Sequence, residues 1–320
     1  MTKPDDSSLD PEDLRAIEAR ARQLLDRAAA WDRFPTPIDD ILAAARVRVA
    51  PTSIFDATSI LAYLKDKAAR AAAGLVDAAL NIKSAISKVF GLYDGHEELI
   101  HIDETVGETK QNFLKLHETA HHDLPTHRKT FRIFEDCEKT LAPEIADQFE
   151  REANNFARFA LFQGDGYARL AADCALEIKS PMKLAKRFGA SIYASSREFA
   201  RTHHRACVVY VLEPIELVAG HGARAIVRRI EPSPSFAARF GVPKDIVITL
   251  DHTLGRLLPV GRRMTRPTSL SIPDLNGTPH ECIAEAFDTT HNVIILLFPV
   301  RALTKTTIVV PSSFAAATSF

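Results

Sequence analysis

The spacing of apolar residues changes near Arg205, and this change limits the folds open to the chain. Before it, segments such as 12–30 and 144–163 repeat apolar residues every three or four positions, which is typical of amphipathic helices. After it, short runs rich in Val, Ile and Leu alternate with turn residues. The sequence therefore predicts an α+β protein, with a mainly helical N-terminal part that carries a small sheet and a mixed α/β C-terminal domain built on a mostly antiparallel sheet.

The N-terminal part is predicted to open with two helices. Asp10 and Thr36 are each followed by a proline and then by helical periodicity, so both residues are expected to cap a helix. Further helices are expected at 53–88, 180–189 and 191–204, a short strand at 47–51, and a hairpin from 89–95 and 98–103. In the C-terminal part, strands are predicted at 207–214, 223–232, 245–250, 258–264, 281–287 and 292–298, with a helix at 234–241.

Composition excludes several classes of protein. The chain has 320 residues, 46% of them hydrophobic, and a formal net charge of -1, which argues against a protein that mainly coats nucleic acid or an anionic membrane. Its N-terminal twenty residues lack the pattern of a secretory signal, and its longest apolar run is about half a membrane span. Cys137, Cys174, Cys207 and Cys282 show no CxxC pairing, so they are expected to be inert thiols in a reducing cytoplasm, with no membrane contact.

The stretch FLKLHETAHHDLP, residues 113–125, carries the strongest chemical signal. On a helix, His117 and His121 face the same way, so both imidazoles can reach one divalent ion. Glu118 is turned by about 100° and lies beside such an ion, where it can act as a general base. The alternative is an exposed helix face, which the apolar neighbours of the histidines disfavour.

A third ligand is predicted in the segment FEREANNFA, residues 149–157. Glu150 and Asn154 are again four residues apart, which suits a ligand and a residue that hydrogen-bonds a ligand histidine. Glu152 is expected to point away into solvent. The alternative is an ordinary surface helix. Two imidazoles and a carboxylate suit Zn²⁺, and Mn²⁺ or iron would bind the same set.

Together these segments resemble the ImmA/IrrE family of metallopeptidases, over roughly residues 12–203. The resemblance implies a zincin-like peptidase domain over 1–168, a helix-turn-helix-like element over 169–205 and a GAF-like sensor or docking domain over 206–320, as in IrrE-like members. It implies metal ligands at His117, His121 and Glu150, with Glu118 as the catalytic base.

By the same resemblance, the substrate is a helix-turn-helix transcriptional repressor of the XRE type. Its cleavage would induce a DNA-damage, other stress or mobile-element response, and a partner in a toxin–antitoxin pair is a further interpretation. The rival hypothesis is a non-cleaving regulator that binds DNA or a partner and keeps a vestigial metal site. Oligomeric state is left open.

The helix-turn-helix-like element is locally basic, which admits DNA contact. A compact helical linker with solvated charges is the favoured interpretation, because the overall charge gives no electrostatic support for DNA binding. His203 and His204 before Cys207 lack a fourth ligand at a suitable spacing, so exposed histidines in a linker are expected there.

Overall fold

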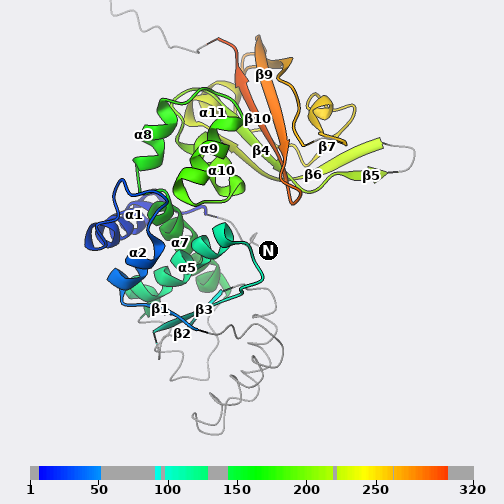
Figure 1. The fold of residues 1–320 in the computed structure, drawn as a ribbon. Coiled ribbons are helices and arrows are strands. Elements are labelled where there is room, and N and C mark those ends of the chain that lie inside the picture. Colours follow the sequence, from blue (N-terminus) through cyan, green and yellow to red (C-terminus); the bar gives the residue numbers. More distant parts are fainter. Residues whose placement is uncertain are drawn as a thin grey trace, which may run out of the picture. The chain divides into compact units, whose positions relative to one another are not determined.

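A computed structural model describes residues 7–51, 91–94, 98–128, 143–218, 222–261 and 263–301, and it has the mixed α+β fold that the sequence predicts (Figure 1). The chain divides into two compact units. The first comprises Met1–Ala175 and Lys179–Phe199, and the second Leu176–Ile178 and Ala200–Phe320. The predicted helix at 53–88, and Cys137, lie outside the described residues.

The first unit is organised around four packed helices. Its longest helix, α7, contacts both α1 and α5, and α2 also packs on α5. Leu24, Leu25 and Phe156 are fully buried in this core, and burial of each such side chain contributes about 1.5–3 kcal/mol to folding. The four helices are α1 (Pro11–Arg27), α2 (Ile38–Ala45), α5 (Glu108–Asp123) and α7 (Pro143–Leu161).

A three-stranded sheet flanks α5. It has the order β1-β3-β2, where β3 (Leu99–Ile102) pairs in parallel with β1 (Arg48–Val49) and antiparallel with β2 (Gly91–Asp94). The β2–β3 pair confirms the predicted strand pairing at this place. Ile100 and Ile102 of the central strand are buried, and α5 contacts both β2 and β3. This arrangement fixes one side of the helix that carries the HExxH motif.

The predicted cap at Thr36 is wrong. Helix α2 begins at Ile38 after Pro37, and the Thr36 hydroxyl instead donates to the carbonyl oxygen of Leu161 at 2.7 Å. Thr36 is buried, and a buried hydroxyl requires a partner, which the last turn of α7 provides through a carbonyl that the helix itself leaves unpaired.

Three shorter helices complete the first unit: α8 (Gly166–Ala172), α9 (Lys179–Phe188) and α10, whose range Ile192–Thr202 runs past the boundary of the unit. The α9–α10 turn has the predicted form. Gly189 has φ +69°, and Ser191 Oγ accepts a hydrogen bond from the backbone N–H of Ala194.

A cluster of aromatic rings attaches this helical pair to the rest of the first unit. Phe188 of α9 lies 5.0 Å from Phe34, 5.8 Å from Phe162 and 5.3 Å from Tyr167, measured between ring centroids. The hydroxyl of Tyr167 donates to the carbonyl oxygen of Ser195 at 2.7 Å. Tyr167 is therefore a buried structural residue.

The second unit is built on a seven-stranded antiparallel sheet of order β5-β6-β4-β10-β9-β8, with β7 paired to β6. Phe236 of helix α11 packs into the core on this sheet, and Ser233 caps that helix by accepting from the N–H of Phe236. The elements are β4 (Val208–Leu212), β5 (Glu216–Val218), β6 (Gly222–Pro232), α11 (Pro234–Phe240), β7 (Val247–Thr249), β8 (Thr268–Pro273), β9 (Pro279–Asp288) and β10 (Val293–Pro299).

One predicted strand is wrong. A 3₁₀ helix at Gly255–Leu257 ends just before the predicted strand, and the described residues of 258–264 form a turn and one isolated bridge, from Met264 to Phe287. Pro259 cannot donate to a ladder, and this disfavours a strand there. The strand lies at Thr268–Pro273, where Leu270 and Ile272 pack against the core while serines alternate outward. Among the described residues, no helix has the length and apolar character needed to span a membrane.

Candidate metal centre

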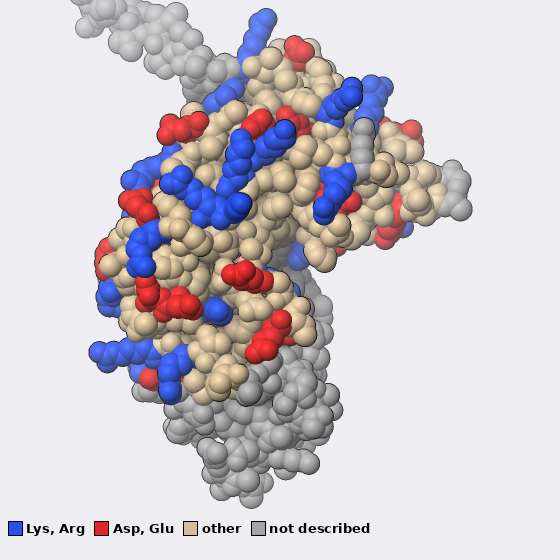
Figure 2. Space-filling model, viewed as in Figure 1, with Lys and Arg blue, Asp and Glu red and all other residues tan. Residues whose placement is uncertain are grey.

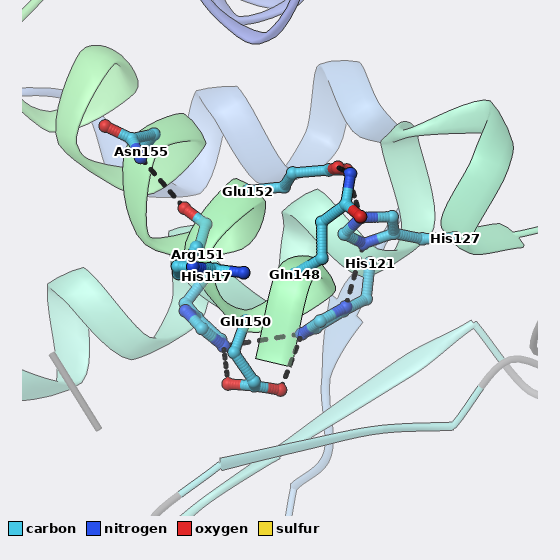
Figure 3. A network of polar contacts seen from close by, with 8 residues as sticks. All are labelled: His117, His121, His127, Gln148, Glu150, Arg151, Glu152 and Asn155. Carbon is cyan, nitrogen blue, oxygen red and sulfur yellow. Dashed lines mark hydrogen bonds and ion pairs between the residues drawn. The ribbon is translucent and has the colours of Figure 1, made fainter. Parts of the chain in front are cut away.

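Helix α5 places two imidazoles side by side. His117 and His121 are one turn apart, and both side chains are buried near the C-terminal end of the helix. Their Nε2 atoms lie 3.3 Å from each other (Figure 3). Two nitrogen atoms this close must share a proton or a cation, because two bare lone pairs, or two N–H groups, would repel each other.

Glu150 of α7 closes the cluster. One carboxylate oxygen lies 3.2 Å from His117 Nε2 and the other 3.7 Å from His121 Nε2 (Figure 3). Metal–ligand bonds of about 2.0–2.1 Å in a tetrahedron give an edge of roughly 3.3–3.4 Å between donor atoms. The two imidazole nitrogens have this spacing, and each faces a different oxygen of the Glu150 carboxylate at 3.2–3.7 Å, so the cluster is close to the arrangement that a zinc ion requires. The Glu150 side chain is 57% exposed, so the cluster opens toward solvent on that side.

The charges in the cluster complement one another. Burial alone would lower the pKa of His117, but the hydrogen bond and the charge of Glu150 outweigh it and raise that pKa. Burial lowers the pKa of His121 to about 3, with a further contribution from the charge of His117. His121 is therefore neutral at physiological pH, which is the form that binds a metal.

Glu118 lies where the sequence predicts a base. Its side chain is 5% exposed, and burial raises the pKa of its carboxyl group to about 7, even though the charge of His117 and a hydrogen bond from the backbone of Tyr93 both favour the ionised form. A carboxyl group with a pKa near the working pH can both accept and release a proton. The strand β2 thus supplies a backbone group that holds this side chain beside the two histidines.

Asn154 contacts the site from one turn after Glu150. It is buried and makes a side-chain hydrogen bond to His117. The structure therefore brings together all five residues that the sequence singles out, namely His117, Glu118, His121, Glu150 and Asn154. Among the described residues, His117, His121 and Glu150 are the group whose donor atoms lie within 4.8 Å of one another.

The prediction that Glu152 points into solvent is wrong. Glu152 is 7% exposed and accepts hydrogen bonds from His127 Nε2 at 2.8 Å and from Gln148 Nε2 at 2.9 Å. His127 in turn contacts His121, with 3.0 Å between their Nδ1 atoms. Glu152 is buried because this side of α7 packs on the chain that follows α5. The sequence signal that could have indicated a partner for Glu152 is His127, six residues after His121.

The other histidines near the motif have structural partners. The Tyr93 hydroxyl hydrogen-bonds His122 Nδ1, and the next residue, Asp123, forms ion pairs with Arg20 at 2.7 Å and Arg27 at 2.8 Å. These ion pairs attach the C-terminal end of α5 to α1. Since His121 lies in that last turn, the ion pairs restrict its position as well.

The sequence predicts exposed histidines at His203 and His204, and the structure places the two residues differently. His203 is buried, contrary to the expectation of an exposed residue, and its Nδ1 accepts a hydrogen bond from the N–H of Arg205 at 3.0 Å. This contact turns the His203 ring toward the segment that leads into β4, and the ring is therefore buried. His204 is exposed, as expected. The backbone N–H of Cys207 donates to Ser233, and burial raises the pKa of the Cys207 thiol to about 12.

The basic residues of the helix-turn-helix-like element are partly engaged. Arg187 lies over the ring of Phe34 at 4.3 Å, and Arg197 is buried with its guanidinium donating to the Tyr193 hydroxyl at 3.2 Å. Figure 2 shows Lys and Arg side chains interspersed with Asp and Glu on the face in view. Arg187 and Arg197 therefore have packing contacts within the first unit.

Comparison with known proteins adds little. No protein-family model matches the sequence, and no curated protein matches it significantly. Among solved structures, a Mycobacterium tuberculosis transcriptional regulator aligns with 88% of this chain and 75% of its own, at 11% identity and a TM-score of 0.48. A similarity this low says nothing about function. The chemistry of the site is accordingly inferred from its own residues.

Proposed function

We propose that the protein is a metal-dependent peptidase that holds zinc through His117, His121 and Glu150. The observation that carries the proposal is the convergence of two imidazole nitrogens and one carboxylate, with 3.2–3.7 Å between facing atoms, beside a buried carboxyl group with a raised pKa. Three protein ligands leave a fourth position open, which distinguishes catalytic from structural zinc sites. The exposure of Glu150 gives a substrate access to that position.

The residues of the site have separable roles. A zinc ion bound there supplies a Lewis acid and lowers the pKa of water. Glu118 is placed to take a proton from the attacking water and to pass it to the leaving amine, because its buried carboxyl group lies beside His117 on the same helix. Asn154 holds His117 through its side-chain hydrogen bond and so orients that ring.

The substrate that we propose is a helix-turn-helix repressor of the XRE type, in the cytoplasm. The support is the resemblance of the two motif segments to ImmA/IrrE peptidases. Cleavage of the repressor would release genes of a stress, DNA-damage or mobile-element response. The second unit, whose sheet we propose to be GAF-like, would then serve as a sensor or docking domain.

The first test is the metal content of the purified protein. We expect about one zinc per chain in the wild type and a loss of most of it in Glu150→Ala, because two imidazoles alone bind weakly. Glu108→Gln is the matched control, since it removes an exposed carboxylate from the first turn of α5. A wild type that takes up neither zinc nor manganese would refute the metal site.

The second test separates a peptidase from a non-cleaving regulator. Glu118→Gln should keep its metal but cleave the XRE-type repressor encoded nearest to its gene about 10²–10⁴-fold more slowly than wild type. Cleavage products would be followed by gel electrophoresis and mass spectrometry. Equal cleavage by wild type and Glu118→Gln would exclude the base mechanism. If neither protein cleaves and both shift the repressor's DNA operator at physiological salt, the regulator hypothesis replaces the peptidase.

A further inference from the structure

We propose that His127 and Glu152 form a relay that positions His121 as a metal ligand by fixing which of its ring nitrogens carries the proton. The inference rests on the proposed metal site. It assigns a role to two buried polar residues outside the HExxH motif, one that follows α5 and one on α7. Both are positioning residues, because they act on the metal only through His121.

The contacts form one unbroken chain. Glu152 lies 2.8 Å from His127 Nε2, His127 Nδ1 lies 3.0 Å from His121 Nδ1, and His121 Nε2 faces Glu150 and His117 (Figure 3). The second carboxylate oxygen of Glu152 accepts from Gln148 Nε2 at 2.9 Å. The links from Gln148 through Glu152 and His127 to His121 are all within hydrogen-bond distance, so the orientation of each ring depends on the next.

With the two rings neutral, only one placement of protons satisfies these contacts. An ionised carboxylate can only accept, so His127 carries its proton on Nε2 and has a lone pair on Nδ1. That lone pair must receive a proton from His121 Nδ1. His121 then has its free lone pair on Nε2, the atom that faces the other two ligands.

Packing holds the relay in place. His127 is completely buried, and its ring stacks on Phe149 with 4.0 Å between centroids and an interplanar angle of 20°. Phe149 and Glu152 both belong to α7, so one helix contacts both the face of the His127 ring and its Nε2 atom. A buried ring held in two ways cannot rotate without losing a hydrogen bond or a packed surface.

The expected consequence is a change in metal affinity. Loss of a partner that orients a ligand histidine weakens metal binding by about 10–100-fold in comparable sites. His117 receives its orienting hydrogen bond from Asn154 instead, so the two ligand histidines are held by independent groups. Removal of the relay should therefore disturb His121 and leave His117 in place.

The affinity experiment uses the full chain and zinc in competition with a chromogenic chelator. His127→Phe keeps an aromatic ring against Phe149 but removes both ring nitrogens, and we expect it to bind zinc 10–100-fold more weakly than wild type. Glu152→Leu should give a similar loss. Glu152→Gln keeps an oxygen that can accept from His127, so its loss should be clearly smaller. Glu108→Gln, on the exposed first turn of α5, should bind as wild type does.

Proton placement in the wild-type protein provides a second measurement that needs no substitution. Two-bond ¹H–¹⁵N NMR spectra should show His127 protonated at Nε2 and His121 at Nδ1. A folded His127→Phe that binds zinc as tightly as wild type, or a His127 ring protonated at Nδ1 alone, would overturn the relay while leaving the metal site intact. A wild type that binds no zinc would overturn both.

Discussion

Replacement of Phe188 by alanine tests how firmly the helix-turn-helix-like pair is attached to the rest of the first unit. Phe188 is completely buried, and its ring contacts those of Phe34, Phe162 and Tyr167. A buried Phe→Ala change costs about 3–5 kcal/mol, and each aromatic pair adds roughly 0.5–1.5 kcal/mol to what burial alone provides. The Phe→Ala range already includes such ring contacts, so its middle value, about 4 kcal/mol, is expected for Phe188→Ala.

The loss is large relative to the whole stability of a domain, which is typically about 5–15 kcal/mol. For a unit of this size, each kcal/mol shifts the melting temperature by about 2–4 °C, so a drop of roughly 8–16 °C is expected. The single tryptophan, Trp31, lies in the first unit, and its fluorescence during urea unfolding therefore reports on that unit alone.

Lys186→Ala is the matched control, because Lys186 is exposed on the same helix and should change stability by no more than about 0.5 kcal/mol. If Phe188→Ala lost less than about 1.5 kcal/mol, the ring cluster would not hold α9 in place. The packing argument for the first unit would then fail.

Three further outcomes follow from the same structure. Excess zinc at about 100 times its dissociation constant should stabilise the first unit by about 2.7 kcal/mol in unfolding followed by Trp31 fluorescence. Glu150→Ala should abolish this stabilisation. If zinc stabilised the variant as much as the wild type, the metal would bind elsewhere. Cys207 is completely buried, and burial raises the pKa of its thiol, so it should resist alkylation in the native protein at pH 8 and react after unfolding in urea. The half-buried Cys174 should react sooner, and rapid native labelling of Cys207, located by peptide mass spectrometry, would contradict its burial. Gly189→Ala should cost about 1–2 kcal/mol in urea unfolding, because φ is +69° there and the added methyl group meets Pro35 at 3.2 Å, and a neutral effect would argue against this turn geometry.

The parts of the site that repeat at helical spacing could be predicted from the sequence. His117 and His121, like Glu150 and Asn154, are four residues apart on regular helices, so their common direction follows from helix geometry alone. Neither spacing predicts that helices α5 and α7 contact each other. That contact depends on the burial of apolar residues such as Leu116 and Phe149 in one core.

The relay could not be predicted in the same way. His127 lies on a separate helical turn, residues 125–128, after α5 has ended, so the spacing of His117 and His121 does not give the direction of its side chain. Glu152 is a charged residue of the kind that is usually solvated. Its burial depends on the partner that faces it across the helix pair. The strand β8 escaped prediction for a related reason, because its serines and threonine resemble a loop until the sheet places Leu270 and Ile272 against the core.

Helix α7 carries Glu150, whose carboxylate faces His121, and Glu152, which hydrogen-bonds His127 and, in the proposed relay, positions His121 through it. Glu150 and Glu152 are two residues apart, about 200° around the same helix. A rotation of α7 about its axis would therefore move both carboxylates together, away from the proposed metal position and from His127. If the proposed site holds a metal, its affinity is thus coupled to the rotation of α7 relative to α5. By thermodynamic reciprocity, any event that turns α7 must change how tightly the metal is held, and binding of the metal must oppose that turn.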